Sequence, residues 1–186
     1  QVANAQLNTT GLDMITEPGY KPEPVVSGFP FVEGPAWNHA SGFLVFSDII
    51  GNTVYRWNER DGLSTFRKPS NMANGTCWDH AGRLLVCEHA TSRVCRIGPG
   101  RHYEVLASHY RGQELNSPND IVVNGNGWIY FTDPNSGRGE KYGIERKQEL
   151  GFQGVYRLDP ETCGLELLVS DFSKPNGLCF SLDEAR

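Results

Sequence analysis

The 186-residue sequence lacks the features that would place it in several common protein classes. It contains no run of 18 apolar residues, so no segment is predicted to cross a membrane. Its 17 Lys and Arg against 22 Asp and Glu give a net charge of −5, which argues against a nucleic-acid partner without excluding a cation. The GxSxG, HExxH and CxxC patterns and a glycine-rich phosphate loop are all absent. A serine triad and a zinc cluster are therefore not supported, and the five cysteines are expected to be buried free thiols.

The N-terminal region has little strand character. Residues 1–24 include Pro18, Pro22 and Pro24, and we expect them to form an arm that precedes the folded region 25–186. The first ten residues lack the basic-then-apolar form of a secretory signal. This leaves two alternatives open, a cytoplasmic protein and a secreted one whose signal has been removed.

A polar residue followed by Gly or Asp recurs along the chain and marks the start of each repeat. It occurs at Glu33, Asn74, Asn119 and Asn176, with spacings of 74 − 33 = 41, 119 − 74 = 45 and 176 − 119 = 57 residues. Spacings of about 40–45 residues are typical of β-propeller blades. We therefore predict an all-β propeller that stops after about three blades and one further strand.

Each of the first three repeats contains four short segments rich in β-branched and aromatic residues. The second strands are expected at 43–48, 83–89 and 128–133, the third at 53–57, 93–97 and 154–158, and the fourth at 63–68, 103–107 and 165–170. A helix is a weak alternative only for residues 140–150. Four antiparallel strands per repeat is the blade of a propeller.

Chain direction places the four repeat-starting residues, Glu33, Asn74, Asn119 and Asn176, on one face of the ring. One carboxylate and three amides in the same register would suit a hard divalent cation such as Ca²⁺ or Mg²⁺. The alternative is turn chemistry, since Asn before Gly tolerates unusual backbone angles. Recurrence in every repeat favours the shared site.

Other candidates lie near the same face as substrate contacts or supporting residues. His89 begins the 88–92 loop as a candidate proton shuttle or substrate hydrogen-bond donor. Asp120 is expected to support Asn119, and Asp133 begins the long 133–153 loop. That loop is expected to form a lid or a wall over the site, or a solvated excursion.

The segments EGPAW, FSDIIGNTVYRW, LNSPNDIVV, IYFTDP, FQGVYR and PNGLCFS together resemble the senescence marker protein/gluconolactonase family, which includes regucalcin. The match runs from about Val32 to the end of the chain and is nearest to the microbial gluconolactonases. The resemblance implies a six-bladed propeller with one divalent cation, Ca²⁺ first, with Zn²⁺, Mn²⁺ and Mg²⁺ as alternatives. Glu33 and Asn176 would bind the metal, and Asn119 would be a further ligand or a substrate contact.

The same resemblance implies the reaction. The cation would polarise a sugar-lactone carbonyl for attack by water, with gluconolactone as the example substrate. The family's general-base Asp would lie beyond Arg186, and Ser117 and Pro118 stand where regucalcin-like members carry an Arg. The alternatives are a phosphotriesterase-like hydrolase with the same metal site and a non-catalytic calcium-binding scaffold.

Overall fold

A computed structural model describes residue 17 and residues 19–184 of the protein. Residues 1–16 and 18 of the expected arm lie outside the described residues, as do residues 185–186. Residues 19–31 form no strand, and the first strand begins at Val32. Within the described part, no helix is long and apolar enough to span a bilayer.

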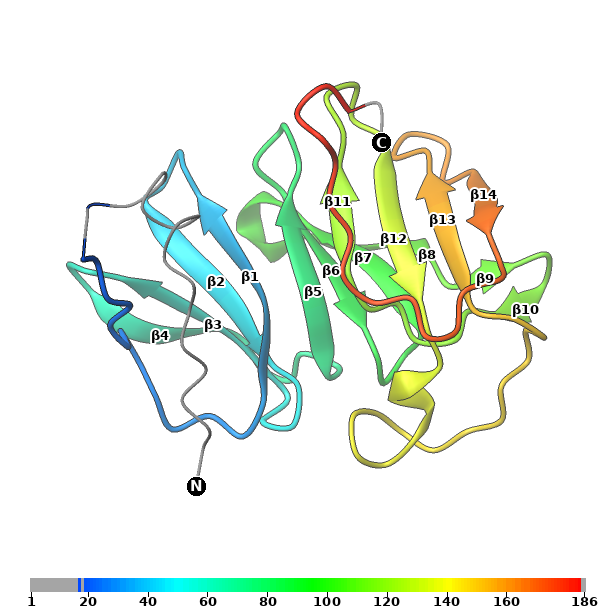
Figure 1. The fold of residues 1–186 in the computed structure, drawn as a ribbon, viewed down its shortest axis with the longest axis horizontal. Helices are drawn as coiled ribbons and strands as arrows, with labels where there is room; N and C mark the ends of the chain where they lie inside the picture. Colours follow the sequence, from blue (N-terminus) through cyan, green and yellow to red (C-terminus); the bar gives the residue numbers. More distant parts are fainter. Residues whose placement is uncertain (1–16, 18, 185–186) are drawn as a thin grey trace.

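Three four-stranded antiparallel sheets follow one another along the chain, and each pairs its strands in sequence order (Figure 1). Blade 1 contains β1 (Val32–Asn38), β2 (Phe43–Asp48), β3 (Thr53–Asn58) and β4 (Gly62–Arg67). Blade 2 contains β5 (Ala73–Trp78), β6 (Leu84–Glu88), β7 (Arg93–Ile97) and β8 (Tyr103–Ala107). Blade 3 contains β11 (Ile121–Val123), β12 (Ile129–Asp133), β13 (Gly154–Leu158) and β14 (Leu165–Val169). The architecture confirms the predicted all-β propeller of four-stranded blades.

The blades pack face to face through two apolar layers. Between blades 1 and 2 the buried residues are Phe43, Val45, Val54, Ala73, Leu84, Val86 and Ile97. Between blades 2 and 3 they include Leu85, Cys87, Val94, Ile121, Ile129, Phe131, Tyr156 and Leu158. Both faces of blade 2 are thus covered, and its second strand β6 is buried throughout. Removing this apolar surface from water is what joins the sheets.

Several details differ from the sequence-based expectations. Residues 140–150 form no helix, and a single 3₁₀ turn, η3 (Ser136–Arg138), lies in the long loop instead. Residues 175–181, expected to be the first strand of a further unit, lie beside blade 3 but form no ladder with it. All five cysteines are free, but only Cys87 and Cys95 are fully buried. Cys163 and Cys179 are exposed because they lie outside the packed strands.

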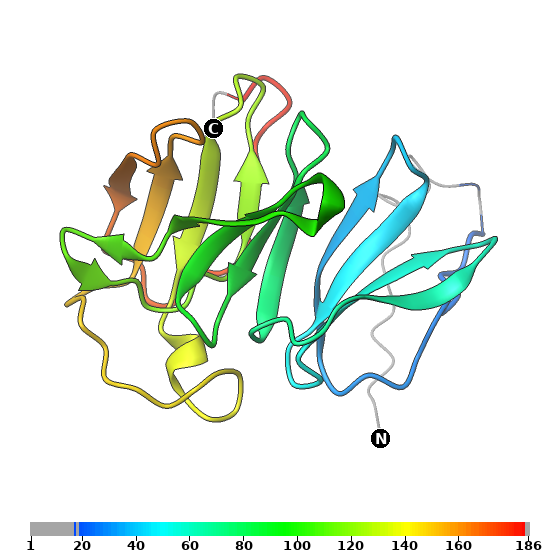
Figure 2. The same ribbon diagram turned by 180° about the vertical axis from the view of Figure 1, so that it is seen from behind.

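Short elements and one long loop connect the blades. A turn of 3₁₀ helix, η2 (Pro99–Arg101), links β7 to β8, and a small hairpin of β9 (His109–Tyr110) and β10 (Gln113–Glu114) follows blade 2. The loop between β12 and β13 lies at the lower end of the molecule, on the side where β1, β5 and β11 begin (Figures 1 and 2). It therefore lies at the same end as the repeat-starting residues.

Candidate functional site

The inner strands of neighbouring blades touch backbone to backbone at the repeat-starting positions. The amide of Gly75 donates to the carbonyl oxygen of Asn119 at 2.7 Å. A Cβ atom added at Gly75 would lie 2.4 Å from that oxygen, and one added at Gly34 would lie 2.2 Å from the carbonyl oxygen of Asn74. Glycine after Glu33 and after Asn74 is therefore required for close approach, and it brings Glu33, Asn74 and Asn119 together on the inner segments of successive blades.

Asn176 is held near these residues through contacts with blade 3. We call Glu33, Asn74, Asn119 and Asn176 the repeat-starting row. The Thr132 hydroxyl donates to the Asn176 carbonyl oxygen at 2.7 Å, and the Leu178 amide donates to Asp120 Oδ2 at 3.0 Å. Asp120 Oδ1 accepts from the Ile121 amide at 2.9 Å. The two Asp120 oxygens thus accept from two backbone amides, one at the start of β11 and one just after Asn176.

The side chains of Glu33, Asn119 and Asn176 have no hydrogen bond or ion pair to any residue that the structure describes. This is most informative for Asn119, which is only 5% exposed. The residue is buried overall, but its carboxamide atoms are not among the fully buried ones that lack a partner, so they still reach solvent and are accessible to a ligand. The described residues contain no cluster of three or more His, Cys, Asp and Glu side chains, so a metal site here would use amide oxygens. One carboxylate and several amide oxygens fit a hard cation.

His89 is buried inside the protein, in contact with Asn74. Its ring is 1% exposed, with Nδ1 2.8 Å from the Tyr142 carbonyl oxygen and Nε2 3.1 Å from Asn74 Nδ2. Burial lowers the pKa of His89 below its usual value, and the nearby Arg146 guanidinium lowers it further. With both nitrogens engaged inside the protein, the structure does not support a direct proton shuttle.

Asp133 also has its oxygens committed to the protein. Its carboxylate accepts the Asn116 and Ser117 amides, each at 2.8 Å, and burial raises the pKa of Asp133 to about 7. Asp48 is at the same position in blade 1 and accepts the amides of Phe31 and Gly51. In blades 1 and 3 an acid at the end of the second strand therefore anchors the neighbouring loops, and Asp133 supports the segment that leads to Asn119.

The long loop is a packed wall and not a solvated excursion. Arg138 is 7% exposed and donates to the carbonyl oxygen of Asn116 at 2.9 Å and to Glu114 at 2.7 Å. Arg146 donates to the carbonyl oxygen of His89 at 2.9 Å. The ring of Tyr142 lies 4.9 Å from that of Phe31, two residues before Glu33. The loop thus extends from blade 3 to the segment that immediately precedes β1 of blade 1.

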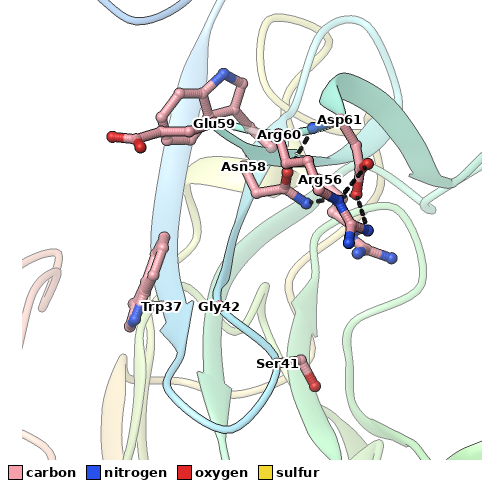
Figure 3. A pocket seen from close by; sticks show the side chains of 9 residues that line it. Trp37, Ser41, Gly42, Arg56, Asn58, Glu59, Arg60 and Asp61 are labelled. Atoms are coloured by element: carbon pink, nitrogen blue, oxygen red, sulfur yellow. Dashed lines mark hydrogen bonds and ion pairs between the residues drawn. The ribbon is translucent and has the colours of Figure 1, made fainter.

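A separate hollow of about 400 Å³ lies at the opposite end of blade 1 (Figure 3). Trp37 borders it on one side, and Arg56, Asn58, Arg60 and Asp61 lie on the other. Its polar side chains already bond one another, since Asp61 accepts from both Asn58 and Arg60. It shares no residue with the repeat-starting row.

The comparison with protein families agrees with this geometry. Residues 31–186 match the model of the SMP-30/gluconolactonase/LRE-like region. The chain belongs to this family. This confirms the resemblance carried by the EGPAW, SPND and PNG segments.

Individual members of the family support the assignment. The chain is 33% identical to the gluconolactonase of Zymomonas mobilis, with 94% of this chain and 52% of that protein aligned. The solved gluconolactonase of Xanthomonas campestris is 35% identical with a TM-score of 0.82, covering 86% of this chain and 54% of its own. A putative gluconolactonase structure is 33% identical with a TM-score of 0.82, covering 87% and 56%. The chain thus spans about half the length of these relatives.

A more distant structure shows the fold alone. The calcium-binding regucalcin of Agrobacterium tumefaciens is 17% identical with a TM-score of 0.64, covering 85% of this chain and 49% of its own. The family and the propeller fold therefore rest on the matches above 30% identity together with the blade topology.

Proposed function

We propose that this protein takes part in the metal-dependent hydrolysis of sugar lactones such as gluconolactone. The observation that carries the proposal is that Glu33, Asn119 and Asn176 start successive inner segments, with Asn74 of blade 2 between Glu33 and Asn119, and that their side chains have no partner among the described residues. The names of the relatives at 33–35% identity supply the lactone as the substrate class.

The donor set favours Ca²⁺ as the cation. All the available atoms are carboxylate or amide oxygens, which Ca²⁺ and Mg²⁺ prefer, whereas Zn²⁺ favours nitrogen and sulfur ligands. Glu33 supplies the only formal charge in the row. A bound cation would polarise the lactone carbonyl and stabilise the negative charge that develops on its oxygen.

The chain's own residues hold the row in place. Asn119 is fixed through its backbone, since its amide donates to the Thr132 carbonyl oxygen at 2.8 Å and its own carbonyl oxygen accepts from Gly75. Thr132 and Asp120 hold the Asn176 segment as described above. The long loop walls one side of this end and limits the access of water. None of the described residues is assigned as the general base.

The test is lactone hydrolysis by the complete gene product. We expect gluconolactone opening to stop on treatment with EDTA and to return with added Ca²⁺, with Mg²⁺, Mn²⁺ and Zn²⁺ compared in parallel. A phosphotriester measured alongside separates the two hydrolase classes. Faster phosphotriester than lactone turnover would reassign the substrate, and full lactonase activity in EDTA would refute the metal dependence.

A further inference from the structure

A buried pair of side chains connects the long loop to the repeat-starting row. Asn74 is 4% exposed and His89 is 1% exposed. Tyr142, at the tip of the loop, contributes a carbonyl oxygen 2.8 Å from His89 Nδ1, and His89 Nε2 lies 3.1 Å from Asn74 Nδ2. Three residues far apart in the sequence thus form one hydrogen-bonded chain that ends at the row.

The direction of each hydrogen bond in this chain follows from the carbonyl group. A carbonyl oxygen only accepts, so His89 Nδ1 must carry the hydrogen. A neutral imidazole has a single N–H, so Nε2 is a bare acceptor and Asn74 must donate to it through Nδ2. The Asn74 oxygen Oδ1 is then the free end of the carboxamide, and it accepts no hydrogen bond from any described residue.

We infer that the 133–153 loop, acting through His89, fixes the carboxamide of Asn74 so that its oxygen faces the row of Glu33, Asn119 and Asn176. His89 is then a positioning residue, and Asn74 adds an oxygen acceptor for the cation or for a hydroxyl of the substrate. The inference deepens the proposed function and rests on it for the nature of that ligand.

Other contacts keep His89 in this arrangement. Arg146 Nη2 donates to the His89 carbonyl oxygen at 2.9 Å, so the loop holds the residue at both backbone and ring. A Cβ atom added at Gly137 would lie 2.6 Å from His89 Cγ, which shows how closely the loop packs on the ring.

Two substitutions separate the hydrogen bonds made by the two ring nitrogens. His89→Gln keeps an acceptor near the Nε2 position for Asn74, whereas His89→Asn keeps a donor near the Nδ1 position for Tyr142 and removes the acceptor. Both are studied in the complete gene product, with thermal unfolding as the check on folding. The readouts are Ca²⁺ affinity by calorimetry, the KM for gluconolactone, and the His89 tautomer from ¹⁵N NMR of ¹⁵N-histidine-labelled wild-type protein.

We expect the wild-type ring to carry its proton on Nδ1. We expect His89→Gln to keep near wild-type values, and His89→Asn to lose about 10–100-fold, the usual effect of removing a residue that orients a ligand. A loss confined to Ca²⁺ affinity identifies Asn74 as a cation ligand, and a loss confined to KM identifies it as a hydroxyl acceptor.

An Nε2–H tautomer in the wild type, or equal losses in two folded variants, would overturn the inference. If His89→Asn does not fold, the wild-type tautomer decides alone. If lactone turnover is absent while the tautomer and the affinity pattern hold, the proposed function falls and the positioning role stands.

Discussion

Gly75 gives the sharpest structural test of how the inner strands are brought together. Its Cβ position would lie 2.4 Å from the Asn119 carbonyl oxygen, where ordinary contacts begin at 3.4 Å, so Gly75→Ala forces blades 2 and 3 about 1 Å apart. The shift also stretches the 2.7 Å hydrogen bond from Gly75 to Asn119. Overpacking costs about 1–3 kcal/mol, and a weakened buried hydrogen bond adds about 1–3 kcal/mol.

We therefore expect Gly75→Ala to lower the free energy of unfolding by about 2–6 kcal/mol in urea denaturation. Gly75 does not have a positive φ, so the backbone conformation itself accommodates alanine. Gly151→Ala is the matched control, because a Cβ atom there meets nothing within 4 Å and its φ is also not positive. Equal stability of the two variants would refute the close-approach argument.

Two further changes test buried charges. Arg67→Met should destabilise the protein by about 3–5 kcal/mol, because it leaves Glu88, which is fully buried, without its 2.7 Å ion pair. Arg60→Met removes an exposed pair and should change the melting temperature little, and equal effects would contradict this difference. The pKa of Asp133 in the folded protein is raised to about 7, so the folded state favours the protonated carboxyl. The stability that protonated Asp133 contributes is therefore complete below pH 4 and is lost as the pH rises to about 7. The loss in free energy of unfolding is at most about 1.4 kcal/mol per pH unit. Asp133→Asn should remove that slope from the urea midpoints, and an unchanged slope would contradict the assignment.

The sequence predicted the blades well because their signal is local. Short runs of β-branched and aromatic residues between Gly, Asn and Asp define strands wherever they occur, and β7, β8 and β13 match the expected ranges. The shared register of Glu33, Asn74 and Asn119 was also predictable, since equal positions in equal repeats must lie on adjacent inner strands. The convergence of their side-chain oxygens on one cation stays a prediction.

What could not be predicted depends on contacts between distant segments. His89 looked accessible because it begins a loop, and it is buried because Tyr142, 53 residues away, folds over it. The structural role of Asp133 could have been inferred from the repeats. Asp48 and Glu88 end the equivalent strands of the other two blades and are also buried. An acid repeated at every blade indicates loop anchoring, whereas a residue specific to one blade is a better candidate for chemistry.

The central claim is that the repeat-starting row binds a divalent cation, and Ca²⁺ calorimetry on the complete gene product tests it most directly. Glu33→Gln removes the only formal charge in the row and should weaken Ca²⁺ binding by at least about tenfold, since affinity follows the number of charged ligands. Glu161→Gln removes an exposed carboxylate in a turn of blade 3 and should bind as the wild type does. Equal Ca²⁺ affinity in all three proteins would contradict the assignment of the site.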